Sequence, residues 1–154
     1  MIVFIFSFRF DPVGQGTLIE DHDFIFWFGD LNYRVAASRE TALELLQGGR
    51  LEEMYSLDQL YQQRMLGNVF AGYKETRPTF YPTYKYDLGS DSYDTSEKLR
   101  TPSWTDRILW RCKRGACRQV SYSIQRTHSI QRTHSRHLRW SIKALPSSAS
   151  SASL

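Results

Sequence analysis

Cysteine, long apolar runs and C-terminal acidic residues are scarce in this sequence, and each shortage narrows what the protein can be. Two cysteines, Cys112 and Cys117, are too few for the disulfide framework of a small secreted domain, so a cytoplasmic setting is the default. The apolar stretch Met1–Phe8 is too short to span a bilayer and lacks the basic lead-in of a signal peptide. We therefore expect a buried strand or a gene-model artefact there, with a membrane or targeting role as the alternative.

Acidic residues are missing from the last part of the chain. Residues 1–106 hold 10 Lys and Arg and all 16 Asp and Glu, whereas residues 107–154 hold 10 Lys and Arg and no acid. The pI of about 9.2 is therefore a property of the tail. The tail also contains a duplicated Ser-Ile-Gln-Arg-Thr-His segment at 123–134 and ends in a run of Ser and Ala, a pattern that predicts either disorder or an incorrect gene model.

The residues before the tail have the pattern of a layered α/β domain. The chain of 154 residues is 41% hydrophobic and 14% aromatic, as in globular proteins, and short apolar runs alternate with helix-like segments. A helix is expected between Ser38, which can cap its start, and Gly48-Gly49, which ends it. The other expected elements are strands at Met1–Phe10, Phe24–Phe28, Thr79–Tyr81 and Ile108–Trp110, a helix from about Leu57 to Leu66, and a loop from Asp87 to Lys98.

The segment Phe26–Arg34 is the most informative part of the sequence, because an aromatic run ends at once in Asp30, Asn32 and Arg34. Asp30 and Asn32 lie two residues apart, so on an extended segment their side chains point the same way. A carboxylate can orient and deprotonate a water, and a neutral amide can hydrogen-bond a phosphate oxygen without repelling it. The pair therefore suits phosphoryl transfer to water. The alternative is a turn in which both side chains bond their own backbone, and Arg34 is expected to pair with a buried carboxylate.

Two later motifs add basic residues and a second carboxylate next to a strand. In Pro82–Asp87, Lys85 can bind phosphate as a point charge, and the Tyr84 hydroxyl can add a second donor. In Arg100–Leu109, Asp106 directly precedes an apolar strand, where a carboxylate can orient a histidine by accepting its N–H. Arg107 is expected to satisfy a buried acid.

These three motifs together closely resemble those of the inositol polyphosphate 5-phosphatases, in the Mg-dependent endonuclease/exonuclease/phosphatase superfamily. The resemblance covers about Asp21 to Arg111. It implies an incomplete DNase I-like α/β sandwich in residues 1–111, followed by the basic tail at 112–154. It also implies a phosphoric monoester hydrolase that uses Mg²⁺ to remove the 5-phosphate of phosphatidylinositol phosphates or soluble inositol phosphates.

The resemblance also implies roles for individual residues. Asp30 corresponds to the water-activating acid, Asn32 to a phosphate contact and Asp106 to the support of a catalytic histidine. The residues that would hold the 4-phosphate of the inositol ring are Tyr84, Lys85, Lys98 and Arg100. The alternative for Lys98 and Arg100 is a pair of solvated loop charges.

The chain also departs from the family pattern. Family members bring an asparagine, a metal-binding glutamate and a histidine from upstream of the first motif, and a second histidine from a downstream Ser-Asp-His segment. We find none of these in the sequence, so no residue is assigned as a metal ligand. Losing one member of a cooperating catalytic set commonly costs several powers of ten in rate. We therefore expect this chain to be an internal piece of a catalytic domain that is inactive, or nearly so, and marginally stable by itself.

Other interpretations have weaker support. Asp87, Asp91, Asp94 and Glu97 lack the spacing of an EF-hand, which favours a solvated loop, and the two cysteines with the tail histidines make a poor zinc site. The expected partners are phosphoinositide headgroups or soluble inositol phosphates, with peripheral attraction to an anionic membrane. One rival is a pseudophosphatase that binds headgroups without turnover. Another is a nuclease or nucleic-acid binder of the same superfamily, although no specific nucleic acid is expected.

Overall fold

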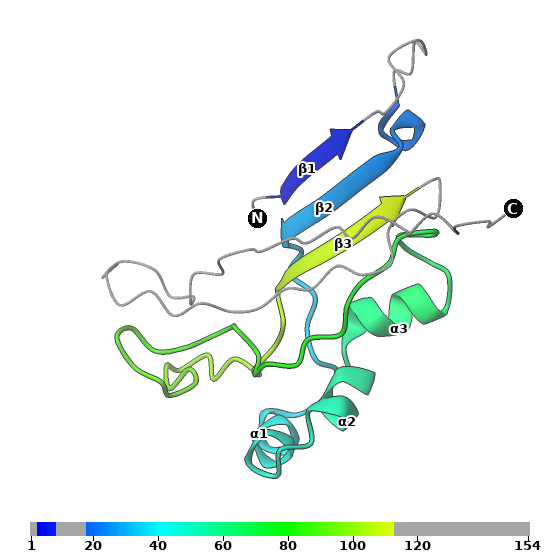
Figure 1. Cartoon of the computed structure of the whole chain (residues 1–154). Helices are drawn as coiled ribbons and strands as arrows, with labels where there is room; N and C mark the ends of the chain where they lie inside the picture. Colours follow the sequence, from blue (N-terminus) through cyan, green and yellow to red (C-terminus); the bar gives the residue numbers. More distant parts are fainter. Residues whose placement is uncertain (1–2, 9–17, 113–154) are drawn as a thin grey trace, which may run out of the picture.

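The structure, a computed structural model, describes residues 3–8 and 18–112 (Figure 1). Its elements run in the order β1 (Val3–Phe8), η1 (a 3₁₀ turn, Ile19–Asp21), β2 (Phe24–Asp30), α1 (Arg39–Gln47), α2 (Leu51–Ser56), α3 (Gln59–Met65) and β3 (Asp106–Cys112). Cys117 and the duplicated segment lie outside the described residues, so disorder of the tail stays a prediction. No helix in the described ranges is long and apolar enough to cross a membrane.

The three strands form an antiparallel sheet in the order β1-β2-β3, with β2 in the centre. Phe26 and Trp110 are cross-strand partners in a buried cluster on one face of the sheet. Ile25 and Leu109, which alternate with them, are fully buried on the other face. Because both faces are covered, β2 is an unbroken apolar run rather than an alternating one. The strand predictions at Phe24–Phe28 and Ile108–Trp110 are confirmed.

The predicted helix between Ser38 and Gly48-Gly49 is present as α1. The Ser38 hydroxyl accepts a hydrogen bond from the Thr41 N–H and so caps the start. The chain leaves the helix through Gly49, whose φ of 68° lies in the left-handed region that glycine adopts without strain. Two short sequence signals were therefore enough to bound this element.

Three elements differ from expectation. The helix predicted from Leu57 begins later, because the Asp58 carboxylate caps α3 by accepting from the Tyr61 N–H. α2 was not predicted; its six residues are too few to show a helical period. The strand predicted at Thr79–Tyr81 is wrong, because this segment joins no strand of the sheet.

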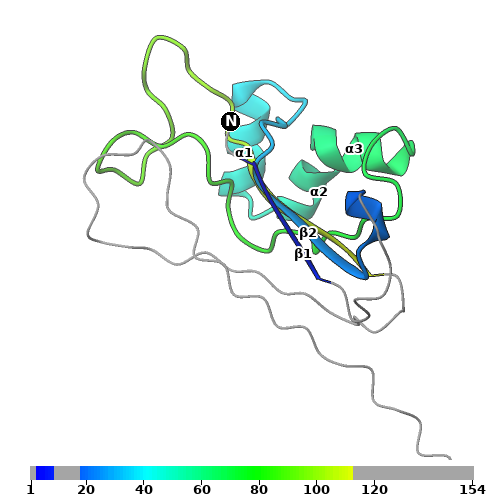
Figure 2. The same ribbon diagram turned by 90° about the horizontal axis from the view of Figure 1, so that it is seen from above.

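The helices are anchored to the sheet by one tryptophan. Figure 2 shows α2 and α3 on one side of the sheet, with α1 beyond the end where β2 stops. Trp104, just before β3, is fully buried in a cluster with residues of α1 and α2. Its indole N–H donates to the Phe80 carbonyl at 2.9 Å. The segment that leads into β3 is thereby fixed against the helical layer.

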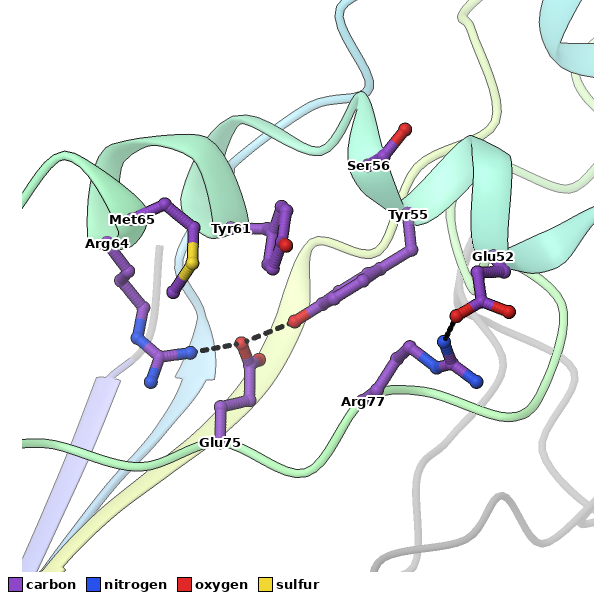
Figure 3. A pocket seen from close by; sticks show the side chains of 8 residues that line it. All are labelled: Glu52, Tyr55, Ser56, Tyr61, Arg64, Met65, Glu75 and Arg77. Atoms are coloured by element: carbon purple, nitrogen blue, oxygen red, sulfur yellow. Dashed lines mark hydrogen bonds and ion pairs between the residues drawn. The ribbon is translucent and has the colours of Figure 1, made fainter.

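A buried ion-pair network reinforces the same junction. Arg107, on β3, has no exposed side-chain surface and donates to Asp58 at 2.8 Å and to Glu75 at 2.7 and 3.0 Å. Glu75 also accepts from Arg64 at 3.0 Å and from the Tyr55 hydroxyl at 3.1 Å (Figure 3). The prediction that Arg107 satisfies a buried acid is confirmed, with two acids in place of one. Three members of the network, Tyr55, Arg64 and Glu75, line an open pocket of about 480 Å³.

Candidate functional site

The first and third motifs meet at one end of the sheet. Asp30, the last residue of β2, is the direct cross-strand partner of Asp106, the first residue of β3. The end of β2 and the start of β3 lie side by side in Figure 1. Side chains of directly opposed residues lie on the same face of a sheet, roughly 5 Å apart at Cβ. Both residues are partly exposed. Two carboxylates that are 76 positions apart in the chain therefore stand side by side at a site that solvent can reach.

The charge state of Asp106 reflects this setting. Burial, and after it the neighbouring charge of Asp30, raise the pKa of Asp106 from 3.8 to about 6. The hydroxyls of Thr83 and Thr105 act in the opposite sense. One carboxyl of the pair is therefore poised to hold a proton near neutral pH.

Asn32 reaches the pair through a turn. Its φ of 58° is left-handed, and its backbone N–H donates to Asp30 Oδ1 at 2.9 Å. The Leu31 N–H donates to the Thr105 carbonyl at 2.8 Å, which ties this turn to the residue before β3. The expectation of an extended segment is therefore wrong, and the turn interpretation holds for the Asp30 side chain. The Asn32 side chain remains exposed.

Arg34 joins the first motif to the second, and its expected pairing with a buried carboxylate is wrong. Its guanidinium donates to Asn32 Oδ1 and to the Asn32 carbonyl, and lies 4.2 Å from the centroid of the Tyr84 ring. Because arginine only donates, this contact turns the amide oxygen of Asn32 towards Arg34. The amide NH₂ group is left available for an acceptor such as a phosphate oxygen.

The second motif runs beside the approach to β3. Tyr84 and Ser103 exchange backbone hydrogen bonds of 3.1 and 2.8 Å. Lys85 does not project freely, because its Nζ donates to Asp94 Oδ1 at 3.1 Å. Asp94, expected in a solvated loop, is fully buried. Burial alone would raise the pKa of Asp94, but the hydrogen bonds that it accepts from Arg100, Ser96 and Lys85 hold it well below its usual range.

Lys98 and Arg100 lie on the loop that Asp94 holds. Both side chains are exposed, and neither forms an ion pair within residues 18–112. The Arg100 carbonyl accepts a hydrogen bond from Arg39 at 3.0 Å, which fixes its backbone and leaves its side chain outside that contact. The structure thus brings Asp30, Asn32 and Asp106 together, joins Tyr84 to them through Arg34, and joins Lys85 to the backbone of Arg100 through Asp94.

Sequence reasoning missed Thr83, Thr105 and Asp94. The two threonines are buried beside Asp106, and nothing in their spacing distinguishes them from packing residues. Asp94 was visible only as one acid among several in a Gly- and Ser-rich loop. What distinguishes Asp94 from the other acids is its set of hydrogen-bond partners, which come together only in the folded chain.

The residues at this end of the sheet do not form a complete magnesium site. No group of three or more His, Cys, Asp or Glu side chains that could hold a metal occurs in the part of the chain that the structure describes. Asp30 and Asp106 supply two carboxylates, and a cation bound there would need further oxygen ligands from substrate phosphate, water or other parts of the protein. We therefore assign no catalytic step to a metal.

Comparison with known proteins places the chain in a family. The model of endonuclease/exonuclease/phosphatase family 2 matches residues 3–137. Human synaptojanin-1 is 50% identical over 97 residues, which are 63% of this chain and 6% of that protein. The inositol polyphosphate 5-phosphatase domain of SPsynaptojanin, solved with inositol (1,4)-bisphosphate and a calcium ion, matches with a TM-score of 0.67 at 38% identity. That match covers 79% of this chain and 34% of that domain structure.

A second kind of solved structure also matches. A Cimex nitrophorin in its ferrous NO complex has a TM-score of 0.63 at 33% identity, over 78% of this chain and 41% of that chain. The mixed α/β architecture therefore corresponds to the 5-phosphatase domain but does not by itself decide the chemistry, which depends on the side chains at the site. The chain spans only about a third of the solved 5-phosphatase structure that it matches. With a family match over most of its length and homologues among synaptojanins and inositol 5-phosphatases, the chain belongs to the endonuclease/exonuclease/phosphatase family.

Proposed function

We propose that this chain carries part of the substrate site of an inositol polyphosphate 5-phosphatase, an enzyme that removes the 5-phosphate of phosphoinositides or soluble inositol phosphates. The observation that supports the proposal best is the cross-strand pairing of Asp30 with Asp106. A relative solved with inositol (1,4)-bisphosphate gives the substrate class. The 5-phosphate, as the phosphoryl group transferred to water with the ring 5-oxygen as the leaving group, would lie over this end of the sheet.

Three residues of the first and third motifs have a proposed catalytic role. Asp30 orients the attacking water and accepts its proton, and the Asn32 NH₂ group donates to a phosphate oxygen as negative charge develops on it. Asp106 holds a histidine in place by accepting its N–H. His22, the one histidine among the described residues, precedes the opposite end of β2, so that histidine has to come from elsewhere in the protein.

The ring itself is recognised by the second motif and the loop after it. In this proposal Tyr84, Lys85, Lys98 and Arg100 bind the 4-phosphate. Mg²⁺, the cofactor that the family resemblance implies, would supply Lewis acidity to the phosphate when bound. The catalytic portion ends near residue 111, and the basic tail at 112–154 adds attraction to anionic headgroups in a cytoplasmic setting, peripheral to the membrane.

Binding and turnover test different parts of this proposal. Calorimetry of the purified chain should show tighter binding of inositol 1,4-bisphosphate than of inositol 1-phosphate, and Asn32→Ala should leave this preference unchanged, because neither ligand carries the 5-phosphate that Asn32 contacts. A duplex DNA that competes equally, with affinity falling steeply as salt is raised, would instead support the nucleic-acid rival. Equal affinity for the two inositol phosphates would refute recognition of the 4-phosphate.

Phosphate release from vesicles that contain phosphatidylinositol 4,5-bisphosphate, with and without Mg²⁺, should be far below ordinary enzyme turnover. The reason is that the described residues hold an incomplete catalytic set. Normal release by the chain alone would support the enzyme class and refute the incompleteness of this chain. Headgroup binding that survives chelation of Mg²⁺, with no release at all, would select the pseudophosphatase.

A further inference from the structure

The loop between the second and third motifs contains one acidic residue that is buried, although acidic residues in loops are usually exposed to solvent. The segment from Asp87 to Arg100 extends away from the sheet and returns to it (Figure 1). Most of its residues are exposed, yet Asp94 has no exposed surface. A buried carboxylate is destabilising unless cations and hydrogen-bond donors surround it. The groups that contact the Asp94 carboxylate therefore indicate its role.

Asp94 connects Lys85, in the second motif, with Arg100, at the start of the third motif. Its Oδ1 accepts from Lys85 Nζ at 3.1 Å and from the Ser96 N–H at 3.2 Å. Its Oδ2 accepts from the Arg100 N–H at 2.9 Å, and its own N–H donates to the Lys85 carbonyl at 2.9 Å. One side chain thus sets the separation between Lys85 and the backbone of Arg100.

The same contacts leave donors for a ligand. An ammonium group has three N–H donors, and Lys85 gives one of them to Asp94. Its side chain is 20% exposed, so solvent or a ligand can reach part of it. The pairing holds the ammonium in one direction, which a four-carbon side chain does not do by itself.

We propose that Asp94 is the positioning residue of the ring-phosphate subsite, holding the Lys85 ammonium and the Arg100 segment at the separation that one phosphate group can bridge. The inference rests on the proposed function, because it assumes that these basic residues meet a phosphorylated ring. It adds a residue that contacts no ligand atom and yet sets the preference for a ring that bears a second phosphate.

Asp94→Asn tests this role, since it keeps the size of the side chain and removes the charge. The measured quantity is the ratio of the dissociation constants of inositol 1-phosphate and inositol 1,4-bisphosphate, obtained by calorimetry on the full chain. Charge-assisted hydrogen bonds are worth enough that the preference for the bisphosphate should fall about tenfold. An acid that only stabilised the fold would change both dissociation constants alike and leave their ratio unaltered.

Asp87→Asn is the matched control. It makes the same change of charge in the same loop, but the Asp87 carboxylate bonds Thr95 rather than a basic residue. The ratio should stay within about twofold of the wild-type value, since surface charges contribute little. If Asp94→Asn does not fold, Asp94→Glu replaces it; the carboxylate keeps its charge, moves by one methylene, and should also lower the ratio.

A wild-type preference that survives in a folded Asp94 variant would overturn the positioning role and leave the proposed function intact. A fall of the same size in Asp87→Asn would overturn it too, because the effect would then be one of net charge. A wild-type chain with no preference would refute the proposed function itself, and this inference with it.

Discussion

The buried ion-pair network around Arg107 makes the sharpest prediction about stability. In Arg107→Met the side chain keeps much of its length but loses every donor, so Asp58 and Glu75 lose the cation between them. All three side chains have no exposed surface, and removal of one partner from a buried pair costs about 3 to 5 kcal/mol. Glu75 keeps Arg64 and Tyr55 as partners, so most of the loss should come from Asp58.

The matched control is Arg50→Met. Arg50 pairs with Glu53 at 3.4 Å, but the side chains are 50% and 60% exposed. Exposed pairs contribute about 0 to 1 kcal/mol. Urea unfolding at pH 7.5, followed by tryptophan fluorescence, should therefore separate two variants that lose the same charge. An Arg107→Met protein within about 1 kcal/mol of the wild type would refute the reasoning.

The pH dependence of the difference provides a second check. Burial already raises the pKa of Asp58 in the folded protein, with Arg107 acting against it. Without Arg107 the pKa of Asp58 rises further. The folded variant is therefore most stable at low pH, where Asp58 is protonated, and its free energy of unfolding falls as pH rises and Asp58 ionises. The gap between variant and wild type should narrow on acidification from pH 7.5 towards pH 4. A gap that is constant over this range would show that the buried charge is not the cause.

Three further predictions concern the site and its support. Because burial and the charge of Asp30 raise the pKa of Asp106 to about 6, the stability of the wild type relative to Asp106→Asn should fall as pH rises from about 4 to about 6; parallel curves for the two proteins would contradict this. Arg34→Gln should weaken binding of inositol 1,4-bisphosphate about tenfold with little change in thermal stability, since it frees the ring of Tyr84, whose hydroxyl is proposed to bind the 4-phosphate; calorimetry with a melting curve checks both. Ser38→Ala should lower the free energy of unfolding by about 1 kcal/mol and leave ring binding unchanged, because it removes only the cap of α1.

The parts of the fold that sequence reasoning predicted are those specified by neighbouring residues. α1 has its cap and its terminating glycines within a few positions of each other, and β2 is marked by its own unbroken apolar run. α2 was missed because six residues show no period. Thr79–Tyr81 has strand-like composition, but a strand exists only through a partner, which no local pattern reveals.

The candidate site divides in the same way. Asp30 and Asp106 were named because each stands at the end of an apolar run, and their meeting depends on a register that the motifs do not contain. Arg34 was given the wrong partner because Tyr84 is 50 positions away. Asp94 was missed because the burial of an acid depends on donors from Lys85 and Arg100, which only the closed loop supplies.

The carboxylates at the end of β2 and β3 have a consequence for evolution of the sheet. Like charges directly opposite each other in adjacent strands destabilise an antiparallel pair. A neutral residue at either position would thus make this edge of the domain more robust, and selection for folding alone would favour it. Proteins in this family that lose the need for chemistry should therefore drift first at Asp30 or Asp106, and should gain thermal tolerance as they do so.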